Sequence, residues 1–203
     1  MFIPMAPTVT PPRLDVLLDA ALAVFDELGY AATPVPVIAQ RAGVAVGSIY
    51  RYVSGKEQLA NELYRREKRR MAMALFDGVD LDTAPADVFR TVWDRLGRFA
   101  AEHPAALGFL ELHHHDPYLD DESRALAAQV DATVGGLLAR WQAAGAVRPG
   151  DPELLTAQVF GGFVGVVRQC RATGRPIDHH LAELTRDAAW GLLAAPAPNP
   201  AAG

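Results

Sequence analysis

The sequence predicts an all-α protein of about nine helices, and three observations support this prediction. Apolar residues recur every three or four positions along almost the whole chain after residue 12, a spacing that places them on one face of a helix. Proline and glycine interrupt this pattern at short intervals, as helix-ending residues do. No segment alternates apolar and polar residues as a half-buried strand does. We therefore expect helices over residues 13–28, 35–41, 46–52, 56–76, 85–102, 104–115, 119–145, 151–174 and 178–194.

The first three predicted helices have the features of a helix-turn-helix. The first helix carries an apolar stripe from Leu14 to Leu28, and Gly29 is expected to end it as a C-cap. The two short helices that follow need a small residue where they cross and a residue that tolerates positive φ in the turn between them. Ala39 and Gly43 supply these two features. Three apolar side chains are spaced to tie the second short helix to the first: Ile38, Val44 and Ile49.

The rest of the chain predicts longer helices separated by clear breaks. The helix over 56–76 carries Leu59, Leu63 and Met71 on one side and a basic cluster, Arg65–Arg70, on the other. A polar linker, 78–85, follows it and is the best candidate for a boundary. The pair Asp151 and Pro152 predicts an N-cap followed by proline at the first helical position. The remaining breaks fall at His103-Pro104, Asp116-Pro117, Gly145, Pro149-Gly150, Gly174 and Pro176.

Composition narrows the class of protein. The single cysteine, Cys170, excludes a disulfide within the chain and fits a reducing cytoplasm. The first residues lack the pattern of a signal peptide, and the apolar run 159–167 is far shorter than the roughly 20 residues that span a membrane. We therefore expect a cytoplasmic protein that does not enter membranes. Residues 1–70 hold nine basic and seven acidic side chains, whereas the remainder holds ten basic and seventeen acidic ones. Only the N-terminal part therefore has the positive net charge that favours binding to a polyanion such as DNA.

One spaced set of residues resembles a known family closely. The set is Ala20, Ala21, Phe25, Gly29, Tyr30, Thr33, Ile38, Ala39, Ala42, Gly43, Val44, Gly47, Ser48, Tyr50, Tyr52, Lys56, Glu57 and Leu59. It is similar to the signature of the TetR/AcrR transcriptional regulators, without a gap from residue 13 to residue 59. Four positions depart from that signature: Pro34, Pro36, Ala45 and Val53. At Ala45, the loss of a capping hydroxyl should cost about 1 kcal/mol of helix stability.

The resemblance implies a domain organisation. Residues 13–55 form a helix-turn-helix DNA-binding domain, and residues 56–77 form a connecting helix. Residues 78–195 form a helical domain that binds a ligand and dimerises, and the tails 1–12 and 196–203 are expected to be disordered. Repression is the usual activity of the family, with release from a palindromic operator when a small effector binds.

The same resemblance implies which residues meet DNA: Thr33, Val46, Gly47, Ser48, Tyr50, Arg51, Tyr52 and Lys56. The two tyrosines, Thr33 and Lys56 are expected to contact phosphates. The others are expected to face base edges, with Arg51 on guanine and Val46 on a thymine methyl group. The alternative is that the tyrosines only border the core and that Arg51 is a solvated charge.

The C-terminal helices predict a dimer interface. Gly161 and Gly165 lie one turn apart in a segment that is apolar almost all round, so one face can cover its own domain and the other a partner subunit. We expect a four-helix interface, two helices from each subunit, that contains Phe160, Gly161, Gly165, Val166, Leu181, Leu184 and Ala188. The alternative is that this segment is the central buried helix of a monomer.

The middle helices are rich in large apolar side chains, each of which is individually more typical of a core than of a ligand site. The family resemblance implies that together they enclose a cavity for a small hydrophobic effector. Its candidate lining is Phe89, Trp93, Phe109, Leu112, His113, Tyr118, Val134, Trp141 and Phe160. Binding there is expected to change the separation of the two recognition helices from the groove repeat of about 34 Å.

The histidines of the Glu111–Asp116 segment leave several interpretations open. His113 follows Phe109 by four residues and is a candidate ligand contact, whereas Glu111 and His115, also four apart, are a candidate metal pair. The cluster is also a candidate pH sensor. The simplest alternative is that these histidines are exposed near a helix C-terminus and interact with its dipole.

Other classes of function find little support in the sequence. A phosphate-binding glycine loop, a nucleophile elbow, paired metal motifs and a Cys–His arrangement are all missing, so we expect no enzyme, no catalytic residue, no metal and no cofactor. Cys170 lies between Arg168 and Arg171, where an inert thiol is expected and redox sensing is the alternative. The competing function is a helical small-molecule or metal-binding sensor, or an interaction protein, that retains a relic helix-turn-helix.

Overall fold

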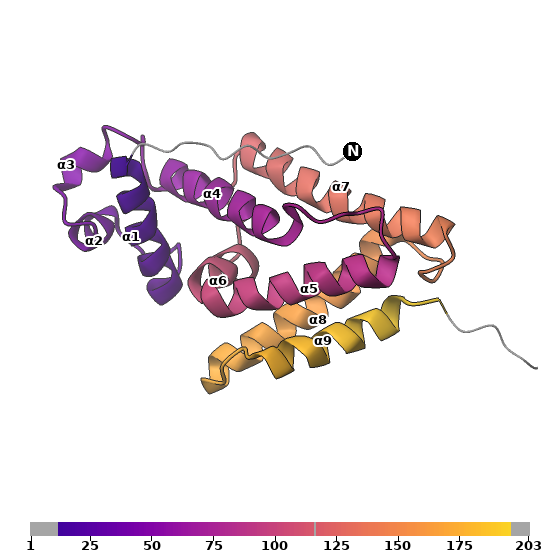
Figure 1. Ribbon diagram of the computed structural model, residues 1–203. Coiled ribbons are helices and arrows are strands. Elements are labelled where there is room, and N and C mark those ends of the chain that lie inside the picture. The colour runs from indigo at the N-terminus through magenta and orange to yellow at the C-terminus, as the bar shows by residue number, and fades with distance from the viewer. Residues whose placement is uncertain (1–11, 116, 196–203) are drawn as a thin grey trace, which may run out of the picture. The chain divides into compact units, whose positions relative to one another are not determined.

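The computed structural model describes residues 12–115 and 117–195, and this part of the chain is helical almost throughout (Figure 1). The helices are α1 (Pro12–Leu28), α2 (Val35–Arg41), α3 (Val46–Ile49), α4 (Lys56–Phe76), α5 (Pro85–Glu102), α6 (Pro104–Leu112), α7 (Asp121–Ala143), α8 (Pro152–Thr173) and α9 (His179–Leu193). Across the described residues the only β contact is one isolated bridge, between Val147 and Ala194. The all-α prediction is confirmed. The predicted tails, apart from Pro12 at the start of α1, lie outside the described residues.

Local sequence signals set most helix ends. The Gly29 N–H donates to the Phe25 carbonyl at 2.8 Å, and Gly29 has φ +77°, so it ends α1 as predicted. The Asp151 carboxylate accepts hydrogen bonds from the backbone N–H groups of Glu153 and Leu154, with proline next to it at the start of α8. Within the described ranges, no helix combines the length and apolar character that crossing a membrane requires.

Two helices, α3 and α6, end three residues earlier than predicted. The α-helical part of α3 ends at Ile49. Beyond it, the Arg51 and Tyr52 N–H groups donate to carbonyls three residues earlier, as in a 3₁₀ turn. Its N-cap, Ala45, makes no side-chain capping bond, as expected from the sequence. Helix α6 ends at Leu112 instead of residue 115, and its C-cap, His113, already has extended backbone angles (φ −93°, ψ 151°).

The first of two compact units comprises Met1–Ala74 and Glu102–Gln129. It contains α1 to α3, nearly all of α4, α6 and the start of α7. Its core surrounds Phe25, which is fully buried and lies parallel to Phe109 of α6 with 5.9 Å between ring centroids. Ile38 and Ile49 are fully buried as predicted, but Leu28 is half exposed. The domain boundaries that the family resemblance implied stay a prediction.

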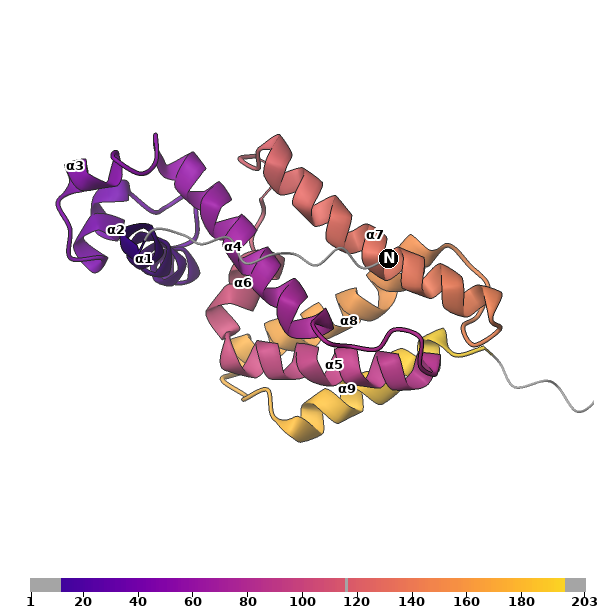
Figure 2. The same ribbon diagram turned by 45° about the horizontal axis from the view of Figure 1, so that its top comes forward.

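The second unit comprises Leu75–Ala101 and Val130–Gly203. Helices α8 and α9 lie side by side in both views (Figures 1 and 2). Aromatic rings fill the space between α5 and these two helices: Phe89 lies 5.1 Å from Trp93 and 5.1 Å from Trp190, and Trp93 lies 5.7 Å from Phe163. The Trp93 indole N–H donates to the Thr185 hydroxyl at 3.2 Å, which joins α5 to α9.

Helices α5 and α9 approach most tightly at Gly97. A Cβ atom placed on Gly97 would lie 2.6 Å from the Cβ atom of Ala182, well inside van der Waals contact. By contrast, a Cβ atom on Gly135 of α7 would meet nothing within 4 Å. Close packing in the second unit therefore favours glycine at position 97 but not at position 135.

We predict opposite effects of two glycine substitutions. Gly97→Ala should lower the free energy of unfolding by about 1–3 kcal/mol, because overpacking outweighs alanine's higher helix propensity. Gly135→Ala should raise it by up to about 1 kcal/mol. Urea unfolding followed by circular dichroism measures both, and Ala182→Gly should rescue Gly97→Ala. A Gly97→Ala variant as stable as the wild type would contradict the tight crossing.

Candidate nucleic-acid interface

The turn between α2 and α3 has the geometry that the sequence predicted. Gly43 has φ +67°, and the Val44 N–H that follows it donates to the Ala39 carbonyl at 3.0 Å. Ile38 and Ala39 are buried, so α2 is fixed against the core. The expectation that Val44 is also a buried plug is wrong, because its side chain is 36% exposed and borders a surface hollow.

Helix α3 and the two residues after it expose side chains to solvent, and most of their polar groups have no hydrogen-bond partner among the described residues. Val46, Gly47, Tyr50 and Arg51 are exposed, and Ser48 is half-buried. None of the Ser48, Tyr50 and Arg51 side chains has a hydrogen bond or an ion pair among the described residues. These predicted DNA contacts therefore lie together on one exposed segment, with polar groups available for an external partner. Their individual roles stay predictions.

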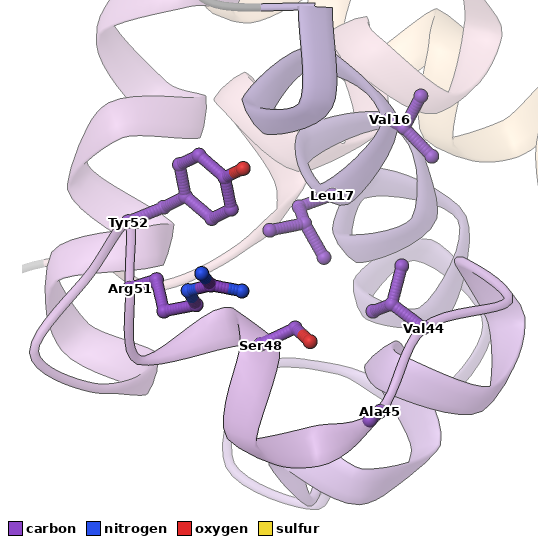
Figure 3. A pocket seen from close by; sticks show the side chains of 7 residues that line it. All are labelled: Val16, Leu17, Val44, Ala45, Ser48, Arg51 and Tyr52. Carbon is purple, nitrogen blue, oxygen red and sulfur yellow. The ribbon is translucent and has the colours of Figure 1, made fainter.

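A hollow of about 360 Å³ lies beside this segment (Figure 3). Its apolar wall comes from α1 and from the turn before α3: Val16, Leu17, Val44 and Ala45. Its polar wall comes from Ser48, Arg51 and Tyr52. Figure 3 shows the Arg51 side chain turned toward Leu17, between Ser48 and Tyr52. Sequence periodicity indicates only that Val16 lies on α1 and gives no sign of the hollow.

Two predicted phosphate contacts are engaged within the protein. The Thr33 side chain is 2% exposed, and its hydroxyl donates to the Gly29 carbonyl at 2.7 Å. The Lys56 ammonium group donates to the carbonyls of Tyr30, Ala31 and Thr33 at 2.9, 3.4 and 3.1 Å. These bonds fix the loop after α1 to the start of α4. They argue against a direct phosphate contact by the Thr33 hydroxyl and leave the Lys56 ammonium group little donor capacity for one.

Two aromatic residues hold the same loop, and sequence reasoning gave neither this role. The Tyr30 ring lies 4.5 Å from the Lys56 nitrogen and stacks on Tyr118 with 3.9 Å between ring centroids. Burial raises the pKa of the Tyr118 hydroxyl. The family signature contains Tyr30, which was the one signal in the sequence, whereas Tyr118 was assigned to the ligand pocket.

His115 is the buried member of the histidine cluster. Its Nε2 lies 2.6 Å from the Phe109 carbonyl and its Nδ1 lies 2.5 Å from the Tyr118 hydroxyl. Burial lowers the pKa of His115 to about 4, although the hydrogen bond to Phe109 acts in the opposite direction. A carbonyl only accepts, so the neutral ring donates through Nε2 and accepts from Tyr118 through Nδ1. The expectation of exposed histidines is wrong at this position.

The candidate metal pair does not form. Helix α6 ends before His115, so the spacing of four residues no longer places Glu111 and His115 on one helix face. The Glu111 carboxylate lies 3.4 Å from the Lys68 ammonium group instead. Across the described residues, no group of three or more histidine, cysteine or acidic side chains is arranged to hold a metal ion.

The basic cluster of α4 is more buried than its sequence suggests. Arg65 is 4% exposed and forms ion pairs with Asp120 at 2.9 Å and with Glu62 at 2.8 Å. Burial by itself raises the pKa of the Asp120 carboxyl. The hydrogen bonds from Ser123 and Arg65 outweigh this effect, so the pKa is lower than its usual value. The cluster was expected on the side of α4 away from the core. Arg65 is buried against the start of α7, whereas Lys68 pairs with Glu111 of α6.

The predicted pocket residues are divided between the two units. Phe109, Leu112, His113 and Tyr118 belong to the first unit, where Phe109 packs on Phe25. The second unit contains the other five: Phe89, Trp93, Val134, Trp141 and Phe160. Phe89, Trp93 and Trp141 are buried there, whereas Val134 and Phe160 are half-buried. The assignment of these nine residues to one ligand site stays a prediction.

The predicted dimer residues include one that faces inward. Leu181 is buried within its own unit, so its assignment to a subunit interface is corrected. Gly161, Gly165, Leu184 and Ala188 are exposed, and Phe160 and Val166 are half-buried. Sequence reasoning missed two further exposed apolar side chains, Leu154 on α8 and Leu192 on α9. Both continue the exposed stripes at helical spacing, a signal that was available.

A helical protein whose first unit presents a free α2–turn–α3 segment belongs to the helix-turn-helix class. Residues 17–63 match the profile described as bacterial regulatory proteins, tetR family, and residues 69–194 match that of the tetracyclin repressor-like C-terminal domain. The chain therefore belongs to the tetR family of bacterial regulatory proteins.

Two regulatory proteins and one solved structure are similar to the chain over different spans. The HTH-type transcriptional repressor KstR2 of Mycobacterium tuberculosis is 33% identical over 118 residues, which are 58% of this chain and about half (54%) of KstR2. The fatty acid metabolism regulator protein of Bacillus subtilis is 26% identical over 153 residues, 74% of this chain and 79% of that protein. The crystal structure of FadR from Bacillus subtilis in complex with stearoyl-CoA shares the fold with a TM-score of 0.73 at 20% identity, covering 90% of this chain and 99% of the other.

The low pKa of His115 predicts a dependence of stability on pH. The unfolded chain binds the His115 proton near pH 6.5, whereas the folded protein binds it only near pH 4. Between these values the unfolded state holds more protons, so stability falls as the pH drops from 6.5 to 4, by about 3 kcal/mol in total. Urea unfolding at a series of pH values should show this loss in the wild type and in His180→Ala.

His115→Phe should lack that part of the pH dependence, although its stability at pH 7 is lower because the Tyr118 hydroxyl loses its partner. A His115 proton titration near pH 6.5, measured by NMR in the folded protein, would contradict the buried neutral ring.

Proposed function

We propose that the protein is a dimeric transcriptional repressor that binds a palindromic operator and is released by a small hydrophobic effector. The observation that carries the proposal is the exposed α3 segment, whose polar side chains have no partner among the described residues. Membership of the tetR family supports the same function. The proposal assigns no reaction to the protein and places its action on chromosomal DNA, hence in the cytoplasm.

The DNA contacts follow from the position of each group on the α3 segment. Residues at the N-terminal end of a recognition helix meet base edges, so Val46 and Gly47 face the groove floor. Tyr50 is 54% exposed, and its hydroxyl donates to a phosphate oxygen. Lys56 acts indirectly, because its bonds to the loop carbonyls hold the start of α2 and the start of α4 together.

Dimerisation uses the exposed faces of α8 and α9. Leu154 and Leu184 are 70% and 58% exposed, values that are high for leucine in a folded protein. A Cβ atom on Gly161 or Gly165 would meet nothing within 4 Å, so packing within the subunit does not explain either glycine. Glycines there let a partner helix approach closely, and this approach offsets their low helix propensity.

The effector is proposed to be a hydrophobic molecule with an acyl chain or a fused-ring skeleton. FadR from Bacillus subtilis was crystallised with stearoyl-CoA, and KstR2 is described as a ketosteroid regulator. The second unit is rich in apolar aromatic side chains, among them Phe89, Trp93, Phe163 and Trp190, which pack against one another and are of a chemistry that matches such an effector. Because an effector releases DNA only if it prefers one conformation, it must bind the free dimer more tightly than the DNA-bound dimer.

We predict that the full-length protein binds the intergenic DNA beside its own gene, as measured by fluorescence anisotropy. Tyr50→Phe should weaken binding at least about tenfold, because a hydrogen bond to a charged phosphate is removed in each subunit. Tyr30→Phe, which removes a hydroxyl away from the α3 segment, should bind like the wild type. Stearoyl-CoA or a steroid, added to the complex, should release the DNA. Equal affinities of wild type and Tyr50→Phe would contradict the phosphate contact.

The dimer interface predicts a second result, for two matched glycine substitutions. Gly165→Leu should convert the dimer to a monomer at micromolar concentration, because the larger side chain keeps the partner helix away. Gly136→Leu on α7, where the glycine is equally open, should remain dimeric. Sedimentation velocity distinguishes the two species. A monomeric wild type, or a dimeric Gly165→Leu variant, would refute this interface.

A further inference from the structure

Arg51 differs from the other cationic side chains described in the first unit. Each of the others has an acceptor or a carboxylate partner: Arg41, Lys56, Arg65, Arg66, Lys68, Arg69, Arg70 and Arg124. Arg51 alone has none among the described residues. An arginine carries five N–H donors in a planar fork that suits a carboxylate or a phosphate.

The surroundings of Arg51 extend this donor set. The hydroxyls of Ser48 and Tyr52 line the same hollow and also lack partners among the described residues. No carboxylate lines the hollow. The nearby α1 carboxylates of Asp15 and Asp19 are held by Arg66, at 3.6 and 2.8 Å. The hollow therefore offers one cation and two hydroxyl donors without a competing anion from the protein.

The opposite wall determines what kind of anion fits. Val16, Leu17 and Val44 form an apolar surface, and the volume of about 360 Å³ is far larger than the roughly 30 Å³ of one water molecule. A phosphodiester of a nucleic acid has this dual character, because its charged oxygens are flanked by the carbon atoms of the sugars. The hollow also adjoins the α3 segment, which the proposed function places on DNA.

We propose that the hollow between α1 and the α3 segment seats one phosphodiester of the operator backbone, with Arg51 as its cation. Arg51 lies beyond Ile49, the last residue of α3, whereas base contacts come from the N-terminal end of a recognition helix. Arg51 is therefore a phosphate ligand that positions α3 and does not identify a guanine. This inference rests on the proposed DNA binding and assigns a source of affinity within it.

The role of the Arg51 charge is tested by measuring the DNA affinity of full-length variants over a series of KCl concentrations. Two duplexes are compared: the intergenic duplex that the wild type binds, and one of unrelated sequence. Arg51→Gln should weaken binding to both duplexes by a similar factor of about ten. The slope of log affinity against log salt should decrease by about 0.9 for each phosphate that the variant no longer neutralises. Arg51→Lys should keep the slope. Arg41→Gln removes the same charge from an arginine paired with Glu27 and should have a smaller effect.

Single methylphosphonate substitutions in the duplex locate the contact. Neutralising one phosphate in each half-site should weaken wild-type binding about tenfold and leave Arg51→Gln binding unchanged. The apolar wall is tested separately by filling the hollow. Val16 and Leu28 lie on α1 and are both 50% exposed, but only Val16 lines the hollow. Val16→Phe should weaken DNA binding, whereas Leu28→Phe should not.

Two results would overturn the inference while the proposed function stands. One is that Arg51→Gln relaxes the preference at a single base pair and leaves the salt slope unchanged, which would make Arg51 a base contact. The other is that Val16→Phe binds DNA like the wild type. If the wild type binds neither the intergenic duplex nor any other, DNA binding itself fails, and this inference fails with it.

Discussion

The packing of α1 against α6 is the contact on which the first unit depends. Phe25 and Phe109 are both fully buried and lie almost parallel, at an interplanar angle of 13°. Phe25 also meets Tyr30, which stacks on Tyr118 and covers the Lys56 ammonium group. The helix-turn-helix is therefore completed by residues far along the chain. Because interiors are close-packed, a displacement of α6 must be accommodated by α1 and by the loop that leads to α2.

Polar groups add directionality to this apolar contact. The Asn61 amide of α4 donates to the Tyr118 carbonyl at 2.8 Å and accepts from the Asp120 N–H at 2.9 Å, so one side chain holds both residues before α7. Arg65 reaches Asp120 and the Ser123 hydroxyl beside it. Burying these groups costs desolvation energy, which their hydrogen bonds recover only in one arrangement. The buried polar face of α4 thus favours a single position of the α7 start, and the neutral His115 ring does the same for the end of α6.

The sequence predicted those features that depend on neighbouring residues. Gly29, Gly43 and Asp151 act locally, through backbone conformation or capping, and each has its expected role. Burial that depends on distant contacts was missed. Arg65 belongs to a run of charges and looked solvated, yet Asp120, 55 residues away, neutralises it. Leu181 shares a helix with exposed apolar residues but faces its own unit. The hollow beside α3 was unpredictable, because its lining comes from α1, from the turn before α3 and from the α3 segment, and no periodicity specifies how these side chains face one another.

We propose that the exposed α3 segments of two subunits recognise a specific DNA sequence as a symmetric pair. The most direct measurement is selection from random-sequence duplexes by the full-length wild-type protein, followed by sequencing of the bound fraction. We expect enrichment of an inverted repeat whose half-sites are centred about one helical turn, or a whole number of turns, apart. Recovery of sequences without a shared motif would contradict it, and a motif without two-fold symmetry would contradict the dimer.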